Sequence, residues 1–208
     1  VFNNWFSVLI FEGKKEVEME RNKSDSLLRN ILPEIIADRM KSTDNAVIAD
    51  HYDNVAVLFA DIVNFTPMAA KATPSELVVI LNSIFSKFDD LTAKYSLEKI
   101  KTIGDSYMAI SGAPTARQNH INDLLHFALA IRDYIAIHER ERGISLRIGI
   151  SAGPVVAGVI GKSKFAYDLW GDTVNTASRM ESHGVPGEIQ VTEEVYEQCK
   201  DTFRFQDR

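Results

Sequence analysis

The sequence predicts an α+β domain with a ferredoxin-like βαββαβ core, preceded by a helical linker. From about residue 45 onward, short apolar runs alternate with longer segments whose apolar residues recur at helical spacing. Val55 to Ala60 contains only Val, Ala, Leu and Phe, which is the composition of a buried strand. Ile100 to Ile110 is interrupted by Gly104-Asp105, as a hairpin is by its turn. A strand, a helix, a hairpin and a second helix, in that order, indicate a ferredoxin-like sheet with its helices on one face.

The remaining elements follow from local patterns. We expect Asp172 to cap the helix that begins there. We expect a turn near Gly153-Pro154 to divide a long apolar segment into a hairpin. The predicted elements are a strand at Val55–Ile62, a helix at Pro74–Tyr95, a hairpin at Glu98–Ser111, a helix at Asn119–Arg142, a hairpin at Ser145–Ile160, a helix at Asp172–His183, a strand at Glu188–Val191, a short helix at Glu193–Cys199 and a final strand at Phe203–Phe205.

The N-terminal segment has a different character. Residues 1–11 are rich in Phe, Trp, Val, Leu and Ile, but they fall well short of the ~20 apolar residues that span a bilayer. Lysines and arginines follow closely, as on the cytoplasmic side of a membrane span. We therefore expect the juxtamembrane end of a transmembrane helix in a longer, membrane-anchored parent. The alternative is a short helix packed on the domain.

Residues 12–44 form the predicted helical linker. Apolar side chains recur at helical spacing in its second half, and Pro33 is expected to end or kink the helix near Leu32. A charged helix of this kind can pair with its own copy and carry a signal, or it can be a solvated strut. The heptads are too few to distinguish these interpretations.

The composition suits one globular domain with an appendage, since 45% of the 208 residues are hydrophobic and 25% are charged. The net charge of −6 argues against nucleic-acid polymers as partners, because phosphate backbones favour basic surfaces. A nucleotide that brings its own metal ions is still compatible. The single cysteine, Cys199, cannot form an internal disulfide, which is typical of a reducing compartment.

Two aspartates stand where apolar runs end. Asp61 follows the run from Val55 to Ala60, and Asp105 lies at the predicted hairpin turn. A single Asp at such a position is commonly a helix cap or a turn residue. Two of them on adjacent strand ends can share a pair of divalent cations, which activates an oxygen nucleophile beside a polyphosphate. These residues alone leave both interpretations open.

A third motif lies between Phe165 and Ser182. Within it, Asn175 and Arg179 are four residues apart, so they lie on one face of the predicted helix and can reach a common ligand. Such a pair is more commonly found on an ordinary protein surface. Taken alone, it does not indicate a function.

Together, the three motifs resemble those of the class III nucleotidyl cyclases, above all the bacterial membrane-bound adenylate cyclases. They read Phe-Ala-Asp-Ile…Phe-Thr, Lys-Thr-Ile-Gly-Asp and Gly-Asp-Thr-Val-Asn-Thr-Ala-Ser-Arg-Met, in this order. The similarity extends from about Asp53 to Val191, and the linker's Leu32-Pro33…Ile36-Ala37 is similar to the segment that precedes such domains. The resemblance implies a catalytic domain of this fold at residues 45–208.

The resemblance also implies a metal and phosphate site. Asp61 and Asp105, with the backbone carbonyl of Ile62, would bind two divalent cations, Mg²⁺ or Mn²⁺, which prefer oxygen ligands. With their help the ribose 3′-OH of ATP would attack the α-phosphorus in line, giving cyclic AMP and pyrophosphate. The phosphates would be held by backbone N–H groups at a helix start. The residues of this predicted phosphate loop are Val63, Asn64, Phe65 and Thr66.

The other half of the site would orient the nucleotide. Arg179 would stabilise charge on the α-phosphate, and Asn175 would orient the ribose. Lys101 and Asp168 stand where the family selects the base: a lysine donates to a ring nitrogen of adenine, and a carboxylate accepts from its amine. Guanine would leave these groups unpaired, so the pair favours ATP. A structural salt bridge between the two residues is the alternative, and it is compatible with base selection.

In this family the site lies at a head-to-tail dimer interface, with the metal aspartates from one chain and the base, ribose and phosphate groups from the other. A chain that carries both sets implies a homodimer with two equivalent sites. Two positions depart from the family pattern. Asn64 stands where glycine is common, and the sequence ends at Arg208, before the expected strand pair with its phosphate-binding lysine.

Three alternatives to an adenylate cyclase stay open. Lys101 and Asp168 argue against a guanylate cyclase. A regulatory cyclase-like domain without turnover commonly lacks a metal aspartate or the arginine, and a purely structural dimerisation domain has no reason to keep them. The expected location of an active enzyme is the cytoplasmic side of the cell membrane.

Overall fold

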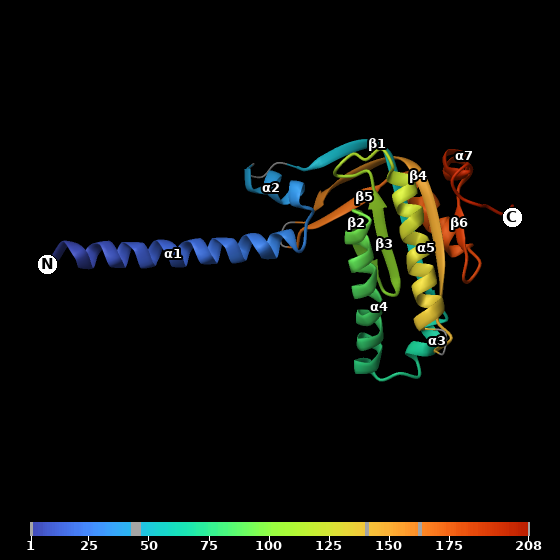
Figure 1. The fold of residues 1–208 in the computed structure, drawn as a ribbon, viewed down its shortest axis with the longest axis horizontal. Helices are drawn as coiled ribbons and strands as arrows, with labels where there is room; N and C mark the ends of the chain where they lie inside the picture. Colours follow the sequence, from blue (N-terminus) through green and yellow to red (C-terminus); the bar gives the residue numbers. More distant parts are fainter. Residues whose placement is uncertain (1, 43–46, 140–141, 162–163, 208) are drawn as a thin grey trace. The chain divides into compact units, whose positions relative to one another are not determined.

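The computed structural model describes residues 2–42, 47–139, 142–161 and 164–207. It consists of two units: residues up to Ile48 together with Val159–Tyr167, and Ala49–Gly158 together with the residues from Asp168 onward. Figure 1 labels the elements along the chain. Their bounds are α1 Phe2–Arg29, α2 Glu34–Ser42, β1 Ala49–Val63, α3 Phe65–Ala69, α4 Pro74–Lys94, β2 Glu98–Ile103, β3 Ser106–Ser111, α5 His120–His138, β4 Ser145–Ile160, β5 Ala166–Trp170, α6 Asp172–Ser182, β6 Ile189–Val191 and α7 Glu193–Cys199.

The first unit contains α1 and α2, which are separated at Pro33 as the sequence predicts. α1 ends at Arg29, because Pro33 lacks a backbone N–H and disfavours helical geometry in the residue before it. Arg29 joins the two helices through ion pairs with Glu34 and Asp38. Within the described residues, no helix combines the length and apolarity that a membrane span requires. Val1, the first residue of the predicted membrane segment, lies outside them.

The second unit is built on a six-stranded sheet in the order β2-β3-β1-β4-β5, with β6 also beside β4. The central strand β1 is antiparallel to both neighbours, and Phe59 lies opposite Met108 of β3 and Gly149 of β4. Alternate residues of a strand point to opposite faces. Leu58 and Ala60 therefore face the main core, and Asp61 faces the other side. The α+β class and the βαββαβ order of the prediction are confirmed.

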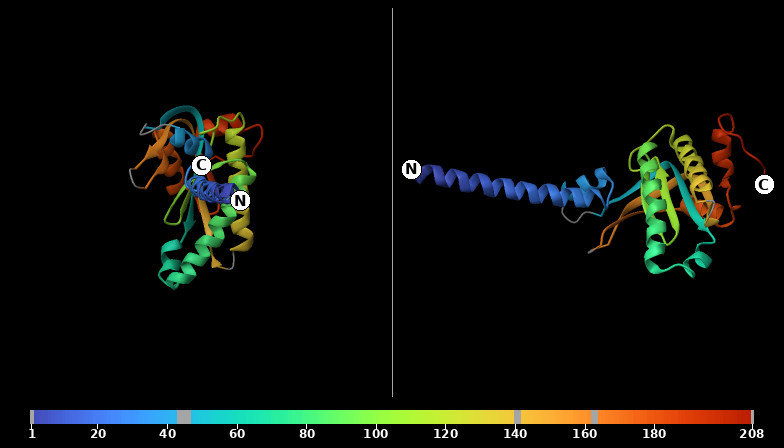
Figure 2. Two further views of the ribbon diagram at one scale, coloured as in Figure 1. Left: turned by 90° about the vertical axis from the view of Figure 1, so that its left-hand side faces the viewer. Right: turned by 60° about the horizontal axis from the view of Figure 1, so that its bottom comes forward.

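Helices cover both faces of this sheet, which differs from the one-sided arrangement predicted. α4 and α5 lie side by side on the core face (Figures 1 and 2). Gly149 of β4 alternates with the core residues Ile148 and Ile150, so it faces away from them. A Cβ atom at Gly149 would lie 2.0 Å from the backbone nitrogen of Glu181, so α6 packs directly on the opposite face.

The predicted hairpin at Ser145–Ile160 is wrong. β4 is one strand that pairs with β1 from Ser145 to Gly158, with a single shift in register between Tyr52 and Val55. Pro154 lies at this shift, where two residues of β1 oppose one of β4. A bulge of this kind tolerates proline, whose missing N–H would otherwise break the ladder.

Three smaller predictions also need correction. The final strand at Phe203–Phe205 does not form; Phe203 and Phe205 instead pack against the core from an irregular segment. The N-cap of α6 is Gly171. Asp172 is the first residue of the helix, and no side chain caps the helix with a hydrogen bond. α5 ends at His138, before the predicted Arg142, and residues 140–141 lie outside the described chain.

Candidate active site

The strand register brings the two predicted metal aspartates together. Asp61 lies near the end of β1 opposite Ser106 of β3, and Asp105 directly precedes Ser106 in the β2–β3 turn. Burial and the nearby Asp61 carboxylate both raise the pKa of Asp105, with burial the larger cause. A divalent cation between the two carboxylates would be favoured, because its charge offsets the burial and the repulsion that Asp105 experiences.

The donor set fits hard cations only in part. Among the described residues, no cluster of three or more His, Cys, Asp or Glu side chains is arranged to hold a metal ion. Asp61 and Asp105 provide two carboxylates, and Ile62, which is buried, provides a backbone carbonyl. Mg²⁺ commonly binds through one or two carboxylates and completes its coordination with water and substrate phosphates. The pair therefore suits ions that arrive with a nucleotide.

Arg147 of β4 lies beside the predicted metal ligand Asp61, and the sequence did not single it out. Its Nη2 donates to Oδ2 of Asp61 at 2.9 Å, and its Nε donates to Oε1 of Glu181 at 3.2 Å. Burial and Asp61 raise the pKa of the Glu181 carboxyl, and Arg147 opposes this rise. The available signal was a charged residue inside the apolar strand Leu146–Ile150, because such a residue needs a partner.

The phosphate-loop residues connect β1 to α3. Val63 is the last residue of β1, and Phe65 and Thr66 form the first turn of α3. Between them, Asn64 has φ 62° and ψ 21°, the left-handed conformation. Asn adopts this conformation more readily than other non-glycine residues. The backbone geometry therefore explains why asparagine can occupy this position.

Lys101 and Asp168 form the salt bridge that the sequence left as an alternative. Nζ of Lys101 lies 2.5 Å from Oδ2 of Asp168, and the side chains are 39% and 17% exposed. The other oxygen of Asp168 accepts a hydrogen bond from the backbone N–H of Leu169 at 2.9 Å. A donor and an acceptor are thus held side by side at a partly open position.

Asn175 and Arg179 lie on α6 and are both exposed. The helix is fixed by its contact with Gly149 and by Thr173, whose hydroxyl donates to the carbonyl of Pro154 at 2.8 Å. In the described chain, neither Asn175 nor Arg179 makes a side-chain hydrogen bond or ion pair. The structure thus does not join them to Asp61 or to the pair formed by Lys101 and Asp168.

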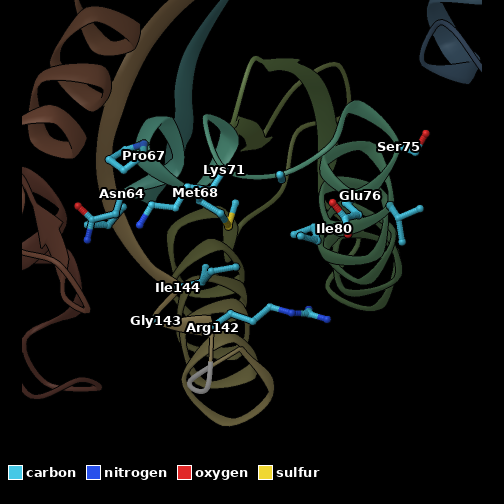
Figure 3. A pocket seen from close by; sticks show the side chains of 13 residues that line it. Asn64, Pro67, Met68, Lys71, Ser75, Glu76, Ile80, Arg142, Gly143 and Ile144 are labelled. Carbon is cyan, nitrogen blue, oxygen red and sulfur yellow. The ribbon is translucent and has the colours of Figure 1, made fainter.

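A hollow of about 870 Å³ adjoins the phosphate loop but not the predicted catalytic groups. Figure 3 shows Asn64 and Met68 on the left, Glu76 and Ile80 of α4 on the right, and Arg142 below them. Asp61, Asp105, Lys101 and Asp168 are not among its lining residues. The hollow therefore meets the predicted site only at Val63 and Asn64.

Comparison with known proteins gives consistent matches over this domain. Residues 47–208 match the family described as the adenylate and guanylate cyclase catalytic domain. An adenylate cyclase of Mycobacterium tuberculosis is 48% identical over 207 residues, which is 98% of this chain and 47% of that protein. A receptor-type guanylate cyclase of Caenorhabditis elegans is 40% identical over 210 residues, 99% of this chain and 19% of the relative.

A solved structure has the same fold. The catalytic core of a rhodopsin-guanylyl cyclase with converted specificity, in complex with ATPalphaS, superposes with a TM-score of 0.72 and 38% identity. The match covers 75% of this chain and 86% of that one. The chain spans about half the length of the mycobacterial relative, so the whole protein's activity is a matter for the proposal that follows.

Proposed function

This chain belongs to the family of adenylate and guanylate cyclase catalytic domains, and we propose that it is an adenylate cyclase that converts ATP to cyclic AMP and pyrophosphate. The observation that carries the choice of base is the contact between Lys101 and Asp168. It presents an N–H donor and a carboxylate acceptor, which match a ring nitrogen and the exocyclic amine of adenine. Guanine offers a protonated N1 and a carbonyl instead, and the mismatch would leave both groups unpaired. The mycobacterial relative named as an adenylate cyclase supports the same choice.

The chain's own residues have distinct roles in the proposed reaction. Asp61 and Asp105, with the carbonyl of Ile62, would hold two divalent cations, Mg²⁺ or Mn²⁺. Bound ions of this kind lower the pKa of the ribose 3′-OH and neutralise the triphosphate. The backbone between β1 and α3 would bind the phosphates through its N–H groups. Arg147 adds a guanidinium beside Asp61, a group suited to phosphate oxygens.

Arg179 and Asn175 would act on a nucleotide bound to a partner chain. Both side chains are exposed, and in the described chain neither forms an ion pair or hydrogen bond with Asp61 or Asp105. A head-to-tail homodimer would bring the α6 residues of one protomer to the aspartates of the other, forming two equivalent sites. Arg179 would then stabilise the charge that develops on the α-phosphate, and Asn175 would orient the ribose. Anchorage of a longer parent chain to the cell membrane, with this domain in the cytoplasm, is part of the same proposal.

The test is formation of cyclic AMP from ATP with Mn²⁺ across a tenfold range of protein concentration, beside Asp61→Ala and with GTP in parallel. We expect specific activity that rises with concentration, is absent in the variant and prefers ATP. Equal or greater turnover of GTP would identify a guanylate cyclase. Calorimetric binding of ATP without turnover at any concentration would identify a regulatory, non-catalytic domain.

A further inference from the structure

Arg147 forms an ion pair with Asp61, the aspartate that the proposed function assigns to a metal ion. The three side chains involved come from different elements: Asp61 from β1, Arg147 from β4 and Glu181 from α6. They are partly withdrawn from water, with 20%, 31% and 10% of their side chains exposed. A divalent ion that binds Asp61 must therefore displace a guanidinium that is already there.

The two contacts of Arg147 use different edges of its guanidinium. Nη2 binds Asp61 at 2.9 Å, whereas Nε binds Glu181 at 3.2 Å. A guanidinium carries several donors in a rigid planar fork, so it can release one carboxylate while it keeps another. Loss of the contact with Asp61 does not require loss of the contact with Glu181.

We propose that Arg147 is a resident cation of the metal site, which a divalent ion displaces from Asp61, and that Glu181 is the positioning residue that retains the guanidinium beside the site afterwards. The inference rests on the proposed function, because it takes Asp61 as a metal ligand. Arg147 lowers the metal affinity of the nucleotide-free protein by competing for Asp61. Glu181 lessens this competition, because it shares the guanidinium and gives it a second anchor.

A purely structural role for Glu181 has a different consequence. Glu181 would then only neutralise a partly buried arginine, and its loss would lower the melting temperature without a specific effect on metal binding. A purely electrostatic role also differs. A nearby carboxylate attracts a metal ion whether or not Arg147 is present, whereas a positioning role exists only through Arg147.

The experiment measures the Mn²⁺ dissociation constant of the full chain without nucleotide, from the electron paramagnetic resonance signal of free Mn²⁺. We expect Arg147→Gln to bind Mn²⁺ about three- to tenfold more tightly, as loss of one competing, partly buried ion pair implies. We expect Glu181→Gln to bind it more weakly by about the same factor, since the guanidinium then pairs with Asp61 alone. In the double variant, the effect of Glu181→Gln should vanish.

Controls separate this inference from the proposed function. Asp61→Ala should lose most Mn²⁺ binding; if it binds as the original chain does, both the metal assignment and the inference are overturned. If Asp61→Ala weakens binding but Arg147→Gln does not strengthen it, the inference alone is wrong. A Glu181 effect that persists without Arg147 also overturns it. Should Arg147→Gln fail to fold, Arg147→Met decides: it keeps the length of the side chain and removes the competing charge, so binding tighter than in the original chain supports the proposal, and unchanged or weaker binding contradicts it.

Discussion

The ammonium group of Lys101 lies 2.5 Å from the carboxylate of Asp168, although 67 residues separate the two in the chain. Their strands, β2 and β5, stand at opposite ends of the strand order. The contact is thus a tertiary one that the fold must assemble. Because both groups are only partly exposed, an incoming base would meet a donor and an acceptor already held in place.

Exchange of this pair should change the preferred nucleotide. We expect Lys101→Glu combined with Asp168→Cys to move the preference from ATP toward GTP, because a glutamate accepts from the protonated N1 of guanine. The measurement is kcat/KM for both nucleotides. Lys99→Glu is a matched control, since Lys99 lies on the same strand but pairs with Asp89 at 2.7 Å and should leave the preference unchanged. Unaltered selectivity in the double variant would refute the base assignment.

Removal of the α6 guanidinium should slow the chemical step. We expect Arg179→Ala to lower kcat by roughly 10²–10³-fold, the usual cost of losing one preorganised donor at a developing charge. Arg132→Ala is the control, because Arg132 pairs with the adjacent Asp133 on the surface of α5. Steady-state kinetics with ATP distinguish the outcomes. A rise in KM with unchanged kcat would assign Arg179 to ground-state binding instead.

Complementation tests the shared site. An Asp61→Ala chain and an Arg179→Ala chain should each be nearly inactive alone. Mixed, they should form heterodimers that contain one intact site, because the two changes fall together in the other site. The measurement is cyclic AMP formation as a function of mixing ratio, with each variant alone as the control. A mixture no more active than its components would rule out a site built from two chains.

The parts of the fold that the sequence predicted well are those with local signals. α4 begins at Pro74, where Thr73 and Glu76 form a reciprocal capping box, and its apolar face continues for 21 residues. The β2–β3 hairpin follows from Gly104-Asp105 in the same way, since a left-handed glycine is a local requirement. Both elements formed within a residue of their predicted limits.

The parts that failed depend on partners distant in sequence. Gly153-Pro154 has turn composition, but pairing with the whole of β1 keeps β4 continuous and converts the pair into part of a bulge. The position of α6 on the second face depends on a close approach to Gly149, which no periodicity reveals. Arg147 was missed for the same reason, because its two partners lie 86 and 34 residues away.

Glu98 should make stability depend on pH. Burial raises the pKa of this carboxyl from 4.5 to about 7, so the folded state binds its proton more tightly than the unfolded state does. Below about pH 4.5 the carboxyl is protonated in both the folded and the unfolded state, so it does not lower the free energy of unfolding. As pH rises from there through about 7, the unfolded state ionises more readily and the folded protein loses stability. We expect Glu98→Gln to be more stable than the original chain by about 1–3 kcal/mol at pH 8 and equal to it near pH 4. Urea unfolding at both pH values measures this, and a gain of the same size at both would contradict the assignment.

Gly149 should be required for the placement of α6. A Cβ atom there would lie 2.0 Å from the backbone nitrogen of Glu181 and 2.5 Å from the carbonyl oxygen of Ala177, and neither atom can move without the helix. We expect Gly149→Ala to cost at least about 2 kcal/mol of unfolding free energy, a typical effect of overpacking. Activity should fall further than the unfolded fraction explains, because α6 carries Asn175 and Arg179.

Gly143→Ala is the control: no atom lies within 4 Å of its added Cβ, so only its left-handed backbone (φ +67°) opposes the change, at about 1 kcal/mol. Thermal melts and cyclase rates measure the loss of stability and of activity in both variants. Equal losses of stability would show that α6 does not pack on β4 this closely.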